Sequence, residues 1–118
     1  MEDISDEGPA LDPACDEAGF YVCGALVGRP DTAEVARWFV RAGWRSRSSS
    51  WHGYEVETAW CRVELDPGDH GGPRTLLNGV IDPARFDTLV ALLSRFGLDG
   101  FGLELYDADD VLLREIDV

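Results

Sequence analysis

Five side chains of this 118-residue chain could bind a soft metal ion: Cys15, Cys23, Cys61, His52 and His70. No pair of them has the close spacing of a zinc finger or a zinc ribbon. The two histidines also flank one expected long strand, whose roughly twelve residues at ~3.3 Å each would hold them up to ~40 Å apart. We therefore expect no metal site, and we interpret Cys23 and Cys61 as small core residues.

Nucleophilic catalysis needs a nucleophile, a neighbouring base and a group that orients the base. The serines at 48–50 are close to His52, but no Gly-x-Ser-x-Gly elbow is present. The glycine-rich loop 68–72 is acidic and precedes a strand, so it lacks the helix N-terminus that binds phosphate. The acidic turn 107–110 lacks the spacing of a calcium-binding EF-hand loop. We predict no catalytic residue, no cofactor and no enzymatic activity; an enzyme with unrecognised chemistry would use His52 or His70.

Four tryptophans within 23 residues are the most distinctive feature: Trp38, Trp44, Trp51 and Trp60. Packing in the core explains such a set, since Trp normally packs. The alternative is that neighbouring strands expose part of it as interface anchors beside carboxylates. On that hypothesis the binding residues are Trp44, Trp51, Tyr54, Glu55, Glu57 and Trp60.

The charge of the chain excludes some partners. Its net charge is −13, which opposes binding to nucleic acid and to anionic membranes. Arg45 and Arg47 could contact nucleic acid, but we expect Glu55 and Glu57 to neutralise them across a hairpin. A basic protein or a cationic ligand is the partner that this charge favours.

The N-terminal residues 1–17 hold seven of the 23 acidic residues, two prolines and no basic residue. We interpret them as an acidic, flexible arm outside a single domain at 18–118. The start of the chain lacks the features of a signal peptide, no apolar run is long enough for a membrane span, and three cysteines suggest no disulfide framework. We expect a cytoplasmic protein; basic residues that are all arginine suggest a GC-rich bacterial genome.

Apolar runs and turn signals place the elements. Strands are predicted at 20–27, 44–51, 54–65, 75–81, 101–106 and 111–116. The apolar parity changes within 54–65, which indicates a bulge, a strong bend or a strand with both faces partly covered. Helices are predicted from Asp31 to Gly43 and from Asp82 to Gly97, each with an acidic N-cap and a glycine stop. The second has Pro83 at its first position.

The order of these elements suggests one β-α-β-β unit used twice, at 20–65 and 75–116. We predict an α+β, two-layer sandwich with two helices on one face of an antiparallel or mixed sheet, a ferredoxin-like variant. Right-handed crossovers would place the first strand of each unit near the sheet centre.

The function favoured by these features is a non-enzymatic acidic protein that binds a basic protein, such as an immunity protein that inhibits a basic toxin. The alternative is a small-molecule-binding or regulatory domain with a Trp-lined cleft. An exposed edge strand at 44–51 would also permit a homodimer.

Overall fold

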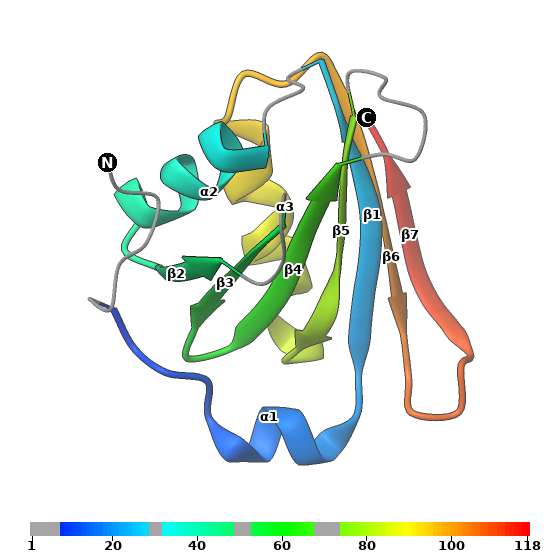
Figure 1. The fold of residues 1–118 in the computed structure, drawn as a ribbon. Coiled ribbons are helices and arrows are strands. Elements are labelled where there is room, and N and C mark those ends of the chain that lie inside the picture. The colour runs from blue at the N-terminus through cyan, green and yellow to red at the C-terminus, as the bar shows by residue number, and fades with distance from the viewer. Residues whose placement is uncertain (1–7, 29–31, 49–52, 68–73) are drawn as a thin grey trace.

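A seven-stranded antiparallel sheet organises the residues that this computed structural model describes, which are 8–28, 32–48, 53–67 and 74–118. The strands are β1 (Tyr21–Val27), β2 (Arg45–Ser48), β3 (Tyr54–Thr58), β4 (Cys61–Pro67), β5 (Arg74–Ile81), β6 (Gly100–Tyr106) and β7 (Leu112–Asp117). The helices are α1 (Pro13–Ala18), α2 (Thr32–Arg41) and α3 (Phe86–Ser94), with a 3-10 turn η1 (Pro83–Arg85) before α3. The strand order is β2-β3-β4-β5-β1-β6-β7 (Figure 1).

The core lies between the sheet and helices α2 and α3. Side chains that alternate along each strand, such as Val22 and Leu26 on β1, are fully buried in one cluster with Phe39 of α2 and Leu89 of α3. This alternation is the period of a strand with one face against the core. The architecture is therefore α+β, with an antiparallel sheet that has more strands than a ferredoxin-like fold.

The predicted long strand at 54–65 is wrong, because the structure divides it into β3 and β4. A turn at Ala59 and Trp60 joins the two strands, and Thr58 lies directly opposite Cys61. Across a two-residue turn, the even-numbered side chains of β3 and the odd-numbered side chains of β4 face the same side of the sheet. The change of parity therefore marks a turn rather than a bulge. The distance inferred between His52 and His70 assumed one straight strand, so it loses its basis. Both histidines lie outside the described residues.

The prediction that the strands at 20–27 and 75–81 lie near the sheet centre is confirmed. Strands β1 and β5 are direct neighbours, and each carries a glycine that faces another backbone. A Cβ on Gly24 would collide with the carbonyl oxygen of Gly102, and one on Gly79 with that of Arg62. These positions exclude any side chain because the neighbouring strand occupies its space.

The second helix begins as its sequence predicts. The Asp82 carboxylate accepts a hydrogen bond from the Ala84 N–H at 3.0 Å, and Pro83 opens the 3-10 turn that leads into α3. The N-cap expected at Asp31 lies outside the described residues, and α2 starts at Thr32. None of the helices in the described ranges is long and apolar enough to cross a membrane.

The segment expected to be an arm includes a helix that is attached to the sheet. Asp12 caps α1 by accepting the Ala14 N–H, and its own N–H donates to the Ala59 carbonyl at 2.9 Å. Leu11 is only 8% exposed. The segment from Leu11 to Ala18 is therefore held against the sheet by these contacts, and the domain boundary expected at residue 18 stays a prediction.

Candidate binding surface

Two of the tryptophans expected to bind a partner, Trp44 and Trp60, lie on the side of the sheet that α2 and α3 cover. Trp44 is only 4% exposed, and its ring centroid lies 4.7 Å from that of Phe39 and 5.3 Å from that of Trp60. Trp60 and Tyr54 are partly buried against the same core. Packing is thus a role of Trp44, Trp60 and Tyr54, whereas Trp51 lies outside the described residues.

The two glutamates of the expected site point the other way. Glu55 and Glu57 flank Val56 on β3, and Val56 is fully buried beneath the helices. Since successive side chains of a strand point to opposite faces, both glutamates lie on the face away from α2 and α3. The structure therefore does not bring the aromatic and acidic parts of the expected site together.

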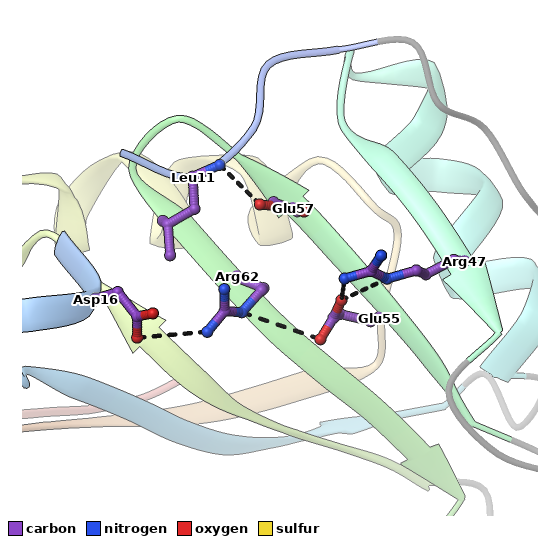
Figure 2. A network of polar contacts seen from close by, with 6 residues as sticks. All are labelled: Leu11, Asp16, Arg47, Glu55, Glu57 and Arg62. Carbon is purple, nitrogen blue, oxygen red and sulfur yellow. Dashed lines mark hydrogen bonds and ion pairs between the residues drawn. The ribbon is translucent and has the colours of Figure 1, made fainter. Parts of the chain in front are cut away.

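The charge of Glu55 is balanced within the sheet. Its carboxylate forms an ion pair with Arg47 at 2.7 Å and a longer one with Arg62 at 4.0 Å (Figure 2). Arg62 also pairs with Asp16 of α1 at 3.4 Å. Arg47 and Glu55 are directly opposite in the β2–β3 pair, which confirms the predicted neutralisation for Arg47. Arg45 lies opposite Glu57 in the same pair, and its neutralisation stays a prediction. These exposed pairs each contribute little to stability, but they leave little net charge for a partner.

Glu57 has a structural task as well. Its carboxylate accepts the backbone N–H of Leu11 at 2.7 Å, as Figure 2 shows. A charged acceptor makes a strong hydrogen bond with an amide, so this contact fixes the N-terminal segment on the sheet. Both glutamates are therefore engaged within the chain.

A different acidic group lies on the same sheet face, at its opposite end. We call the face of β5, β1, β6 and β7 that points away from α2 and α3 the open face. It carries Glu104 of β6 and, on β7, Glu115 directly opposite Glu104 and Asp117 opposite Gly102. Glu115 and Asp117 have no ion pair within the described ranges.

These carboxylates border a hollow of about 390 Å³. Its centre is made of small or apolar groups, Ala25, Leu76 and Gly102, which lie side by side on β1, β5 and β6. The absence of a side chain at Gly102 lowers the surface there. The hollow can therefore take an apolar or aliphatic group while the carboxylates at its rim bind a cation.

A pair of stacked tyrosines adjoins this acidic group. The rings of Tyr21 and Tyr106 lie 5.0 Å apart at an interplanar angle of 13°. The Tyr106 hydroxyl donates to Glu104 at 2.7 Å, and the Tyr21 hydroxyl donates to Asp110. Donation to a carboxylate favours the protonated phenol, and it raises the pKa of both tyrosines to about 12. Both rings remain neutral hydrogen-bond donors at physiological pH.

Basic side chains are scarce on the open face. Among the described residues of its four strands, the base on this face is Arg74, at the start of β5. Arg114 of β7 points to the helix side, where it pairs with Asp87 at 2.8 Å and lies over the Phe86 ring. Arg114 holds the pKa of Asp87 below its usual range through this hydrogen bond. The carboxylates at the β7 end are thus not neutralised by their own sheet.

The sequence carried a signal for this surface that the tryptophan-based prediction did not use. Leu103 and Leu105 are the buried side of β6, so the alternation places Glu104 and Tyr106 together on the other side. The hairpin 101–116 was predicted, but its order in the sheet was not. Only that order shows that β7 lies at an edge.

The cysteines of the described ranges form no further site. Cys61 is fully buried, as predicted, and burial raises its pKa. The prediction that Cys23 is a core residue is wrong, because its side chain points to the open face and is only partly buried; desolvation and Glu104 raise its pKa. Among the residues that the structure describes, no three His, Cys, Asp or Glu side chains gather as metal ligands.

Comparison with protein-family models, with curated proteins and with solved structures found no match to this chain.

Proposed function

We propose that this chain is a non-enzymatic protein that binds a basic protein, and that its open face is the binding surface. The observation that supports this proposal is the group formed by Glu104, Glu115 and Asp117, which borders an apolar hollow. Carboxylates that their own fold does not pair are complementary to lysine and arginine of a partner.

The surface contains both components of a protein interface. Its negative charge would accelerate encounter with a basic partner, and the net charge of −13 adds to that attraction. Tyr21 and Tyr106 offer stacked rings with polar tips, which is the kind of group that anchors interfaces. A small immunity-type inhibitor of a basic toxin, in the cytoplasm, would have these properties.

The test is co-expression with the product of the adjacent gene, followed by affinity measurement at rising salt concentration. We expect binding that weakens as salt rises, because screening reduces the attraction between exposed charges. The double variant Glu115→Lys and Asp117→Lys should lose binding. The matched control, Glu64→Lys and Asp66→Lys, makes the same charge change on β4 and should retain most of it. Binding that is insensitive to salt and to the β7 variant would reject the proposal.

A second candidate function is small-molecule binding in a Trp-lined cleft. Two adjoining hollows of about 360 and 340 Å³ share Ala42 and Arg95; one is lined by Trp38 and the other by Trp44. Volumes of this size suit small ligands. The carboxylates lie on the other sheet face, so a ligand here would be an anion rather than the cation that the composition favours.

Fluorescence of the tryptophans during a titration tests this second candidate. Benzoate should give a saturable change, whereas the uncharged benzamide should not, because Arg95 and Arg41 provide the guanidinium groups for a carboxylate. Arg95→Gln should weaken the benzoate response. Equal responses to both compounds would reject an anion site.

We also propose that the duplicated, two-layer ferredoxin-like arrangement underlies this fold. The order β6-β1-β5-β4, with α2 after β1 and α3 after β5, has the pattern of that fold, and β2, β3 and β7 would be additions. An experimental structure in which the β1-α2 and β5-α3 segments fail to superpose would reject the duplication.

A further inference from the structure

The strand β7 ends the sheet and has no neighbour beyond it in the described strand order. It spans six residues, most of them exposed. Four of the five exposed large apolar side chains recorded in the described ranges lie in or beside it, namely Val111, Leu112, Leu113 and Val118. An exposed edge with apolar side chains is a template for pairing with another strand.

The hydrogen-bond ladder shows which backbone groups face outward. The N–H of Val118 donates to the carbonyl of Phe101 at 2.9 Å, and the register of β6 and β7 places these two residues opposite each other. Hydrogen-bonded and non-hydrogen-bonded pairs alternate in an antiparallel ladder. The N–H and C=O groups of Glu115 and Asp117 therefore point away from β6, toward the open edge.

The same two residues carry the carboxylates at the rim of the hollow. Glu115 and Asp117 thus present backbone groups for strand pairing and acidic side chains on the open face. Ile116, between them, points to the helix side and is packed against the core. A strand that pairs here would place alternate residues next to the two carboxylates and the intervening ones next to Ile116.

We propose that a segment of the basic partner adds to β7 as an extra strand, with arginine or lysine at alternate positions beside Glu115 and Asp117 and apolar residues between them. This inference rests on the proposed binding function and specifies its geometry. Main-chain hydrogen bonds would provide affinity, and the alternating side chains would provide specificity.

A second copy of this chain fits the edge less well. Two-fold antiparallel pairing of β7 with itself keeps each face of the sheet continuous, so a residue of the same parity must lie opposite. The two registers centred on the middle of β7 place Arg114 opposite Arg114 or Glu115 opposite Glu115. Like charges directly opposite each other destabilise a strand pair. A basic segment meets no such conflict at the two carboxylates.

The test uses a blocked six-residue peptide of alternating arginine and valine with the full, isotope-labelled chain, followed by NMR. Two matched peptides carry N-methyl groups, either on the arginines or on the valines, and keep the same charge. We expect binding of the parent peptide to protect the amides of Glu115 and Asp117 from hydrogen exchange. One methylated peptide should bind about tenfold more weakly or worse, since it loses two or more hydrogen bonds.

The methylated position also reports the direction of the strand. Loss of affinity on arginine methylation indicates antiparallel pairing, and loss on valine methylation indicates parallel pairing; either asymmetry supports strand addition. Equal affinity of all three peptides would overturn the inference but leave the charge-based binding function intact, provided that Glu115→Lys with Asp117→Lys abolishes it. No binding of any peptide, or binding that this variant leaves unchanged, would count against the function itself.

A dimer of the chain alone, with the same two amides protected from exchange, would overturn the inference in favour of self-association. Sedimentation analysis of the unliganded chain separates this outcome. Leu113→Lys offers a further variant, because it places a positive charge on the open side of β7 and should repel the arginine peptide without removing any core contact.

Discussion

The two edge strands of the sheet differ in length, in side chains and in what lies beside them. Strand β2 has four residues, Arg45–Ser48, with no exposed large apolar side chain, and its Arg47 pairs with Glu55 of the next strand. Gly8 lies against the backbone of residues 43–45, where a Cβ on it would have no space. Strand β7 is longer, exposes apolar side chains and carries unpaired carboxylates.

The two edges differ in how open they are to pairing with a strand of another chain. A short edge with charged side chains resists pairing with foreign strands. The β2 edge is short, and its Arg47 is paired with Glu55 within the chain (Figure 2). The β7 edge is longer, exposes apolar side chains and carries two carboxylates without an ion pair in the described ranges, which is consistent with an edge that is kept available for a partner. The comparison can be tested by changing one edge at a time.

The largest difference in free energy of unfolding is expected between a buried residue beside β2 and an exposed residue of β7. Trp44→Ala should lower the free energy of unfolding by about 3–5 kcal/mol, because a buried ring that packs on Phe39 leaves a cavity. Leu113→Ala at the β7 edge should change it by less than about 0.5 kcal/mol. Chemical denaturation of both variants measures this; a large effect of Leu113→Ala would show that β7 is a packed strand rather than an available edge.

The two glycines Gly102, in the hollow beside β7, and Gly24, on the other face of the sheet, should differ in whether they accept a side chain. Gly24→Ala should destabilise the fold by about 3 kcal/mol, because the new Cβ collides with the Gly102 carbonyl. In Gly102→Ala the new Cβ has its nearest contact at 3.6 Å and should be accepted. Thermal unfolding compares the two variants. If Gly102→Ala is equally destabilising, the hollow is a tightly packed part of the fold and not room for a partner.

One of the contacts that hold the N-terminal segment near the β2 side is a charged acceptor, Glu57. Glu57→Gln weakens the bond from the Leu11 N–H and should cost about 1 kcal/mol. Hydrogen exchange of the Leu11 amide should accelerate, with Glu64→Gln as the control that removes an acidic charge from the neighbouring strand. Unchanged exchange would mean that the N-terminal segment is held by other contacts.

The smallest effect is expected for the tyrosine pair beside β7. Folding raises the pKa of Tyr21 and Tyr106 to about 12, above the ordinary value of about 10, so their contribution to stability is complete below pH 10 and is lost between pH 10 and 12. Asp110→Asn should lower the pKa of Tyr21 toward 10 and leave Tyr106 unchanged. Phenolate absorbance during a pH titration follows both tyrosines. An unchanged pKa of Tyr21 in the variant would show that Asp110 does not raise it.

The sequence alone determined the local features of this protein. It predicted the N-cap at Asp82 and the acidic turn before β7, since each depends on residues only a few positions apart. The Asp107 carboxylate indeed accepts the N–H groups of Asp109 and Val111 in that turn. The pairing of Arg47 with Glu55 followed in the same way from strand alternation across one hairpin.

The tertiary structure decided which of these features share a surface. The change of parity in 54–65 was visible, but a bend and a hairpin both explain it until the partner strands are known. Glu55 is close in sequence to Trp44 and Trp60 but lies on the opposite face of the sheet, whereas Glu104 and Asp117 come together only through the β6–β7 pairing. Strand order depends on contacts between distant segments, so no local pattern reveals that β7 is an edge.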